Sequence, residues 1–175
     1  MKNIEISELS EWTGKLTVGE EVLLNGYVYT ARDAVPKKFS ALISEGKELP
    51  IDIRGAVIYY AGPTPSKHGM AVGSCGPTTS SRMDKHTPML LDMGLGGIIG
   101  KGERNREVVE AIKKNRSVYF CALGGAGALY AKCIKGCEVI AFEELGCESL
   151  KKMRVENFPV YVAIDCHGGN IFERA

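Results

Sequence analysis

Two short segments of the chain concentrate residue types that bind anions. The first, residues 73–84 (GSCGPTTSSRMD), places a Gly-Pro turn before four hydroxyl side chains, Thr78 to Ser81, and then Arg82. The second, residues 99–104 (IGKGER), holds Lys101 between two glycines. The first N–H groups of a helix have no partners within it and carry partial positive charge. A helix opening at Thr78 would therefore form a cradle for a carboxylate or phosphate.

Cationic side chains from three separate segments could serve the same ligand. Arg82 lies four residues after Thr78, so both would share one face of a helix, and its planar guanidinium can bind a carboxylate through two hydrogen bonds. The backbone freedom of its flanking glycines suits Lys101 to a defined place near a ligand. Arg32 ends the first strong strand pattern, residues 21–31. On a chain of balanced charge, this grouping predicts a small dianionic ligand.

Each of these residues also has a purely structural interpretation. Thr78 and Thr79 could cap a helix without touching any ligand. Arg82 and Lys101 could form ordinary surface ion pairs, and Arg32 could pair with Asp33 to fix the turn after the strand.

Composition excludes several classes of function. The 175 residues carry 22 Lys and Arg against 21 Asp and Glu, a formal charge of +1, which lacks the basic excess of a general nucleic-acid binder. No apolar run approaches the roughly 18 residues of a spanning helix, and the start, MKNIEISELSEW, has no signal-peptide core. We expect a single domain, residues 1–175, in the cytoplasm.

The sequence lacks the motifs of a self-sufficient active site. Residues 94–104 (GLGGIIGKGER) miss the glycine spacing of both nucleotide-binding loops, and there is no G-x-S-x-G. The six cysteines form no C-x-x-C pair, so we predict mostly buried, reduced thiols rather than a zinc site. Of three histidines, His86 near Arg82 is the one candidate accessory group. These features predict half an active site, completed by a partner chain.

The elements that would position these residues mix strands and helices. Strands are expected at residues 21–31, 56–61, 97–100, 117–122, 138–142 and 159–165, and the chain should re-enter structure at 70–72. Helices are expected with Pro36 in the first turn, from Thr78, with Thr87 as N-cap and Pro88 next, after Asn105, and after the glycine-rich segment 124–131. Strands outnumber helices without strict alternation, which favours an α/β fold with a mixed β-sheet core and flanking helices.

Several motifs together resemble one enzyme family. GPTTSSRMD, IGKG, GGAGAL, EELGCESL and VENFPVYVAID occur in the order found in the β subunit of two-subunit class I fumarases and the related tartrate dehydratases. The same unit forms the C-terminal domain of single-chain class I fumarases. The resemblance runs from the segment around Arg32 to Asp165 and implies a swivelling β/β/α domain.

The resemblance also implies an activity and a set of site residues. These hydro-lyases add water across fumarate to give malate, with an oxygen-sensitive 4Fe-4S cluster held by three cysteines of the other subunit, the α subunit. Carried over by position, the substrate-binding residues are Arg32, Gly76, Thr78, Thr79, Arg82 and Lys101. Thr78 is the family's candidate base, although a neutral threonine needs activation by groups of the partner. An α2β2 assembly is expected.

One position departs from the family. Relatives carry Arg-Asp-x-x-His after the first strand, whereas Pro36 stands at the histidine position here. Either that histidine is dispensable or the activity is altered. We expect fumarate as substrate because the chain ends soon after VAIDCHGGN. The alternatives are the β subunit of L(+)-tartrate dehydratase and a non-catalytic anion-binding module of the same fold.

Overall fold

Apolar side chains along the central strands build two hydrophobic cores. The structure is a computed structural model that describes residues 1–173, and its strand β3 (Val57–Tyr59) sends Val57 and Tyr59 into one core and Ile58 into the other. Successive side chains of a strand point to opposite faces, so a strand that is apolar throughout has both faces covered.

The other elements follow the predicted order with two additions. The strands are β1 (Lys2–Glu5), β2 (Glu21–Thr30), β4 (Gly97–Gly100), β5 (Val118–Cys121), β6 (Ile134–Ala141) and β7 (Leu150–Ile164). The α-helices are α1 (Leu9–Trp12), α2 (Ala34–Ser44), α3 (Thr87–Asp92), α4 (Arg106–Lys114) and α5 (Gly127–Cys133). Short 3-10 turns η1 (Ile6–Glu8), η2 (Thr13–Lys15), η3 (Ser80–Met83) and η4 (Glu143–Glu148) connect them. Strand β1 and helix α1 were not predicted.

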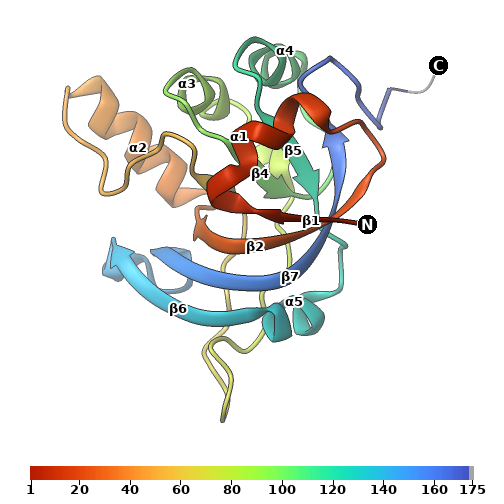
Figure 1. The fold of residues 1–175 in the computed structure, drawn as a ribbon. Coiled ribbons are helices and arrows are strands. Elements are labelled where there is room, and N and C mark those ends of the chain that lie inside the picture. The colour runs from red at the N-terminus through yellow and green to blue at the C-terminus, as the bar shows by residue number, and fades with distance from the viewer. Residues whose placement is uncertain (174–175) are drawn as a thin grey trace.

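The strands pair so that the sheet closes on itself. Strands β2, β3, β4 and β5 run parallel in that order, and β7 lies antiparallel to both β5 and β2. Strand β1 pairs with the first half of β2, and β6 pairs with the first half of β7. In Figure 1 the long strands β2 and β7 cross the front of the molecule side by side. The predicted mixed α/β fold with flanking helices is confirmed.

Helices cover the two sides of this closed sheet differently. Residues of α2, α3 and α4 pack with the outward-facing strand residues in one core, and these helices lie together at the top of Figure 1. Helix α5 belongs to the other core, where Tyr130 and Phe158 stack with ring centroids 4.5 Å apart. Within residues 1–173, no helix is long and apolar enough to cross a membrane.

Local sequence signals placed several boundaries correctly. Asn105 caps α4, its side-chain oxygen accepting the N–H of Val108 at 2.9 Å. Pro36 lies in the first turn of α2, where its missing N–H costs nothing. Helix α3 starts one residue earlier than expected, because His86 occupies the N-cap position and Thr87 is already helical.

Two strands are longer than predicted, and the element expected at residues 70–72 is missing. Strand β7 starts at Leu150 rather than residue 159, and β6 starts at Ile134 rather than residue 138. Their polar first halves pair with each other, and β7 also pairs with β2, so tertiary pairing outweighs a weak apolar pattern. Residues 70–72 form no helix or strand.

Candidate active site

The candidate site lies where four parallel strands end. Arg32 follows β2, Gly62 follows β3, Lys101 follows β4 directly, and Gly124 follows β5. Parallel neighbours place their carboxyl ends at the same edge of a sheet, which is where α/β proteins bind ligands. The structure therefore brings Arg32 and Lys101, which are 69 positions apart in the sequence, to one edge.

Glycines give both cationic side chains room at this edge. A Cβ built on Gly62 would lie 3.0 Å from Nη1 of Arg32, and one built on Gly124 would lie 3.2 Å from Cδ of Lys101. The stem of each cation thus lies against a residue that follows the neighbouring strand. A side chain at either glycine would crowd the cation beside it.

The segment 76–80 runs alongside the same strand ends. Thr78 donates its N–H to the carbonyl of Tyr60 at 2.7 Å, and Ser80 donates its N–H to the carbonyl of Lys101 at 2.9 Å. Thr79 pairs with Lys101 in a single parallel bridge. Gly76 packs against Gly127 of α5, with 3.5 Å from its ideal Cβ to that residue's Cα. These contacts bring the Gly-Pro-Thr-Thr turn next to Lys101.

The predicted helix that opens at Thr78 does not form. A 3-10 turn begins at Ser80, Thr79 is extended, and its side chain makes no capping hydrogen bond. The N–H groups of Thr78 and Ser80 donate to backbone carbonyls at the strand ends. The prediction of an anion cradle at a helix N-terminus is therefore wrong. Thr78 and Arg82 consequently do not share a helix face. Pairing with a neighbouring strand end, which a local pattern does not reveal, outweighs the capping signal.

The four hydroxyl side chains divide into different environments. Ser80 is fully buried, Thr78 is half-buried, and Thr79 and Ser81 are exposed. The Ser80 hydroxyl accepts the N–H of Lys101 at 2.9 Å, so it serves the protein's own backbone. Among residues 1–173, the hydroxyls of Thr78 and Thr79 have no hydrogen-bond partner, which leaves them available to a ligand.

Asp33 joins the two arginines of the site. Its carboxylate accepts hydrogen bonds from Nε of Arg82 at 3.0 Å and from the Nη2 atom of the same guanidinium, and its Oδ2 lies 3.6 Å from Nε of Arg32. The hydrogen bond to Asp33 raises the pKa of Arg82. Asp33 has φ 44° and ψ −79°, a conformation that L-residues rarely adopt and that is often retained at functional sites.

Glu148 is a site residue that sequence reasoning missed. Its carboxylate lies 3.4 Å from Nε of Arg32. The ammonium of Lys151 holds the same loop by hydrogen bonds to the carbonyl of Gly146 at 3.0 Å and to the hydroxyl of Ser149 at 2.6 Å. The acidic segment 143–148 connects β6 to β7, and nothing in its local sequence indicates that it folds back onto the end of β2.

These ion pairs agree in part with the purely structural interpretation of the cations, in which they form ion pairs within the chain. Arg32 and Arg82 are both paired with carboxylates of this chain, whereas Lys101 is exposed and has no ion-pair partner among the described residues. Two carboxylates offset two of the three cations. A dianion bound here needs either a shift of Asp33 or Glu148 or positive charge from elsewhere.

No metal site can be built from the described residues. Residues 1–173 contain no group of three or more His, Cys, Asp or Glu side chains that could hold a metal ion. All six cysteines are free, but burial was predicted for most of them and holds only for Cys75, Cys121 and Cys166, while Cys147 is exposed. Burial raises the pKa of Cys75 to about 12. The described residues of this chain therefore do not fit an iron-sulfur cluster.

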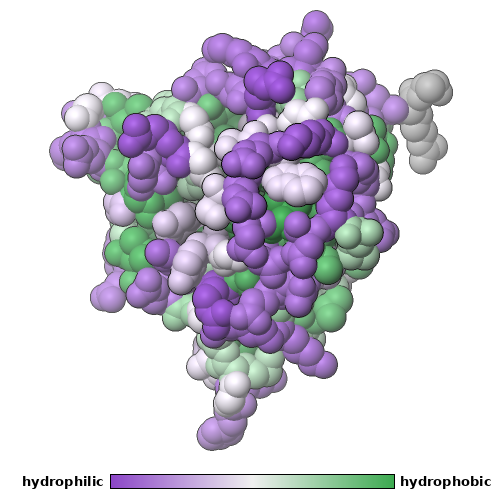
Figure 2. Space-filling model, viewed as in Figure 1, coloured by the Kyte–Doolittle hydropathy of each residue, from purple (hydrophilic) through white to green (hydrophobic). Residues whose placement is uncertain are grey.

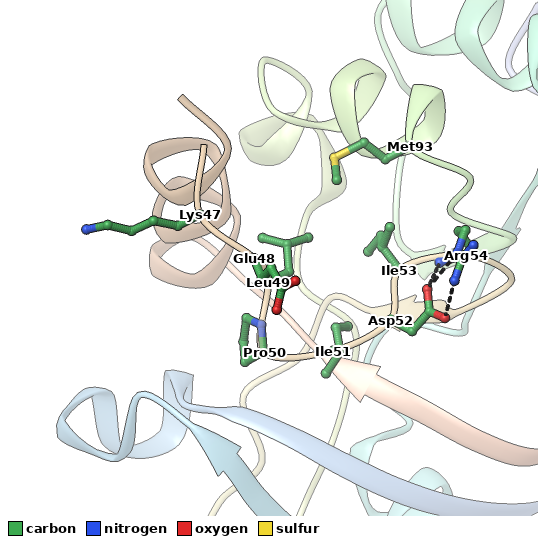
Figure 3. Close-up of a pocket in the computed structure, with 9 residues that line it drawn as sticks. All are labelled: Lys47, Glu48, Leu49, Pro50, Ile51, Asp52, Ile53, Arg54 and Met93. Atoms are coloured by element: carbon green, nitrogen blue, oxygen red, sulfur yellow. Dashed lines mark hydrogen bonds and ion pairs between the residues drawn. The ribbon is translucent and has the colours of Figure 1, made fainter. Parts of the chain in front are cut away.

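Neither His86 nor the surface hollow beside α2 belongs to this edge. The Nδ1 atom of His86 lies 2.7 Å from the hydroxyl of Ser40 on α2, so the ring links the N-cap of α3 to that helix. Figure 3 shows a hollow lined by residues 47–54 and Met93, in which Asp52 and Arg54 pair with each other at 3.1 Å. It contains none of the predicted site residues.

Comparison with known proteins shows which family the chain is similar to. Residues 1–175 match the family described as "Fumarase C-terminus". The chain is 37% identical to "Fumarate hydratase class I, anaerobic" of Escherichia coli over 99% of its length, and 36% identical to "Fumarate hydratase 2" of Leishmania major over 97%. It covers 31% and 30% of those two proteins. It is also 38% identical to "Putative L(+)-tartrate dehydratase subunit beta" of Methanocaldococcus jannaschii, over 91% of this chain and 85% of that protein.

Proposed function

Because this chain belongs to the family of fumarase C-terminal domains, we propose that it is the β subunit of a two-subunit hydro-lyase that interconverts fumarate and (S)-malate. The observation that carries the proposal is the grouping of Arg32, Lys101 and the Gly-Pro-Thr-Thr turn at one edge of the parallel strands. The chain spans about 30% of the length of the fumarate hydratases named above, and the proposal assigns the remainder of the enzyme to the α subunit.

In the proposed reaction, the chain's cations bind the substrate carboxylates. When malate loses water, a proton leaves the carbon next to one carboxylate, and negative charge builds on that carboxylate. Arg32, Arg82 and Lys101 stabilise the transition state, in which this charge develops, more strongly than they stabilise bound malate. This difference lowers the barrier. Arg82 becomes available when the substrate carboxylate competes with Asp33 for its guanidinium.

Thr78 is the proposed base, and its hydroxyl must be activated to act as one. Its half-buried hydroxyl has no partner among residues 1–173, so it is free to accept a proton from the substrate carbon. A threonine hydroxyl is a weak base at neutral pH, so its activation is assigned to groups of the partner. A 4Fe-4S cluster held by that α subunit would supply a Lewis acid for the departing hydroxyl. The proposal includes an α2β2 assembly in the cytoplasm.

The second candidate function is the β subunit of L(+)-tartrate dehydratase. It is favoured by the relative of that name, since this chain covers 85% of it and the two chains are of similar extent. Tartrate carries one more hydroxyl than malate, and the same cations would bind its two carboxylates. The edge therefore accommodates either substrate class, and the assay must include both.

The test is an anaerobic assay of the chain purified with its candidate α subunit, after reconstitution with iron and sulfide. We expect fumarate to be hydrated to malate, with little turnover of tartrate. A preference for tartrate would transfer the proposal to the second candidate. A stable, cluster-loaded complex that turned over neither substrate would reject both and favour the non-catalytic anion-binding module, for which Pro36 at the family's histidine position would be the first suspect.

A further inference from the structure

We propose that the buried hydroxyls of Ser80 and Tyr119 form a relay that positions Lys101 for the substrate. The inference rests on the proposed function, because it assigns Lys101 a substrate carboxylate. The relay starts and ends on the loop that carries the lysine. Three contacts define it: Lys101 N to Ser80 Oγ at 2.9 Å, Ser80 Oγ to Tyr119 Oη at 2.9 Å, and Tyr119 Oη to the carbonyl of Gly102 at 2.8 Å.

Tyr119 is the donor in both of its contacts. Its hydroxyl lies within hydrogen-bond distance of two acceptors, Ser80 Oγ and the carbonyl of Gly102, and its single proton is shared between them. Ser80 Oγ in turn accepts the N–H of Lys101. Such chains polarise one another in a low-dielectric interior, and this one fixes the N–H of Lys101 and the carbonyl of Gly102.

The relay is anchored below by a buried ion pair. Arg104 has no exposed side-chain surface, and its Nε donates to Asp84 at 2.6 Å. Its guanidinium carbon lies 4.9 Å from the ring centroid of Tyr119 and 5.3 Å from that of Tyr60. The second oxygen of Asp84 accepts the N–H of Asn105 at 2.8 Å. The ring of Tyr119 is thus held by a cation that is itself held in place.

The backbone on both sides of Lys101 is closely constrained around the relay. A Cβ on Gly100 would lie 1.9 Å from the Ser80 hydroxyl oxygen, so glycine is required there for the serine to reach the loop. Gly102 has φ 85°, which turns the chain directly after Lys101. Both glycines that flank the lysine therefore serve the relay. The exposed ammonium stands on a backbone that is fixed on both sides.

A double-mutant cycle tests the proposal in the assembled enzyme. Tyr119→Phe removes one hydroxyl and keeps the ring against Arg104, and Lys101→Ala removes the cation. We expect Tyr119→Phe to raise KM about 3- to 10-fold with kcat changed less, the size expected for one lost hydrogen bond that supports binding. In the Lys101→Ala background the same change should alter KM less than about 2-fold, because coupled sites are not additive.

Hydrogen exchange supplies a readout that does not depend on turnover. In both Tyr119→Phe and Ser80→Ala complexes, the peptide containing residues 100–103 should exchange its amide hydrogens at least about 10-fold faster. Tyr130→Phe is the matched control: like Tyr119, this tyrosine donates its hydroxyl to a backbone carbonyl, that of Pro159 at 2.9 Å. It should leave exchange at 100–103 unchanged.

Each outcome decides the proposal. An equal KM increase with and without Lys101, unchanged exchange at 100–103, or a Lys101→Ala enzyme with normal KM would overturn it. If the parent complex turns over neither fumarate nor tartrate, the proposed function fails by itself. The relay is then decided by exchange: faster exchange confined to residues 100–103 supports it, and unchanged exchange rejects it.

Discussion

At the scale of single residues, the site combines free and paired functional groups. Thr78, Thr79 and Lys101 have no side-chain partner among the described residues, whereas Arg32 and Arg82 share the carboxylate of Asp33. Free groups can bind a ligand at once, while paired ones must exchange one carboxylate for another. The role of Thr78 and the state of His86 can each be tested by one substitution.

Thr78→Ala should lower kcat of the assembled enzyme by about 100-fold or more while changing KM little, because general base catalysis contributes about 10²–10⁴ in rate. Steady-state kinetics with malate under anaerobic conditions measures both constants. Thr79→Ser, at the exposed neighbouring position, is the control and should stay near the parent. An increase confined to KM would reassign Thr78 to substrate binding.

His86 should make the fold less stable in acid. Partial burial, with Lys85 and Lys37 nearby, lowers the pKa of His86 below its ordinary value of 6.5. Protonation then favours the unfolded chain, so this stability is complete above pH 6.5 and is lost as the pH falls through the folded pKa. The melting temperature of His86→Gln should fall less between pH 7.5 and pH 5 than that of the parent. An equal fall in melting temperature for both proteins would show that His86 does not cause the acid sensitivity.

At the scale of elements, a buried ion pair connects η3, α3 and α4 beneath the site. Arg104 donates to Asp84 after η3 and, at 2.9 Å, to the hydroxyl of Thr87 in α3, while Asp84 also accepts the N–H of the α4 N-cap, Asn105. The Nη1 atom of Arg104 is buried without a hydrogen-bond partner among residues 1–173. The other contacts of the network offset the free energy of its desolvation. The pair matters here because it fixes how three elements meet.

Arg104→Met should destabilise the protein strongly. Removing one partner of a buried pair leaves the other charge buried and uncompensated, which costs about 3–5 kcal/mol. Chemical denaturation of the purified chain measures this loss. Arg54→Met, which breaks the exposed pair with Asp52, is the matched control and should leave the denaturation midpoint almost unchanged. Similar shifts for both variants would contradict the account.

At the scale of the whole molecule, one edge of the closed sheet carries the proposed substrate-binding groups, without a metal-binding group among the described residues. The strand ends carry cations and hydroxyls, and no metal-binding group occurs among residues 1–173. The face shown in Figure 2 is largely hydrophilic, with apolar residues in smaller areas between polar ones. A chain with two cores and a closed sheet is expected to fold without help, yet to hold only part of the chemistry.

The isolated chain should therefore be folded and inactive. We expect one cooperative thermal transition, no absorbance from a cluster, and no turnover of fumarate or tartrate until the α subunit is added. Circular dichroism, visible absorbance and a coupled assay on the same sample measure these properties. Turnover by the chain alone would disprove the half-site interpretation.

The sequence by itself located the central strands β2 to β5, the starts of several helices and most of the candidate residues. Asn105, Pro36 and the apolar runs of β3 to β5 act through local geometry, so a linear pattern reveals them. The motifs around Thr78 and Lys101 likewise pointed to an anion site.

The tertiary structure alone decided how those residues are used. It paired the first half of β7 with β2 and β6, replaced the predicted helix at Thr78 with contacts to the strand ends, and buried Ser80. It also brought Glu148 to Arg32 across 116 positions of sequence. Each of these outcomes depends on partners distant in the chain, whose hydrogen bonds and charges outweigh local preference once the sheet closes.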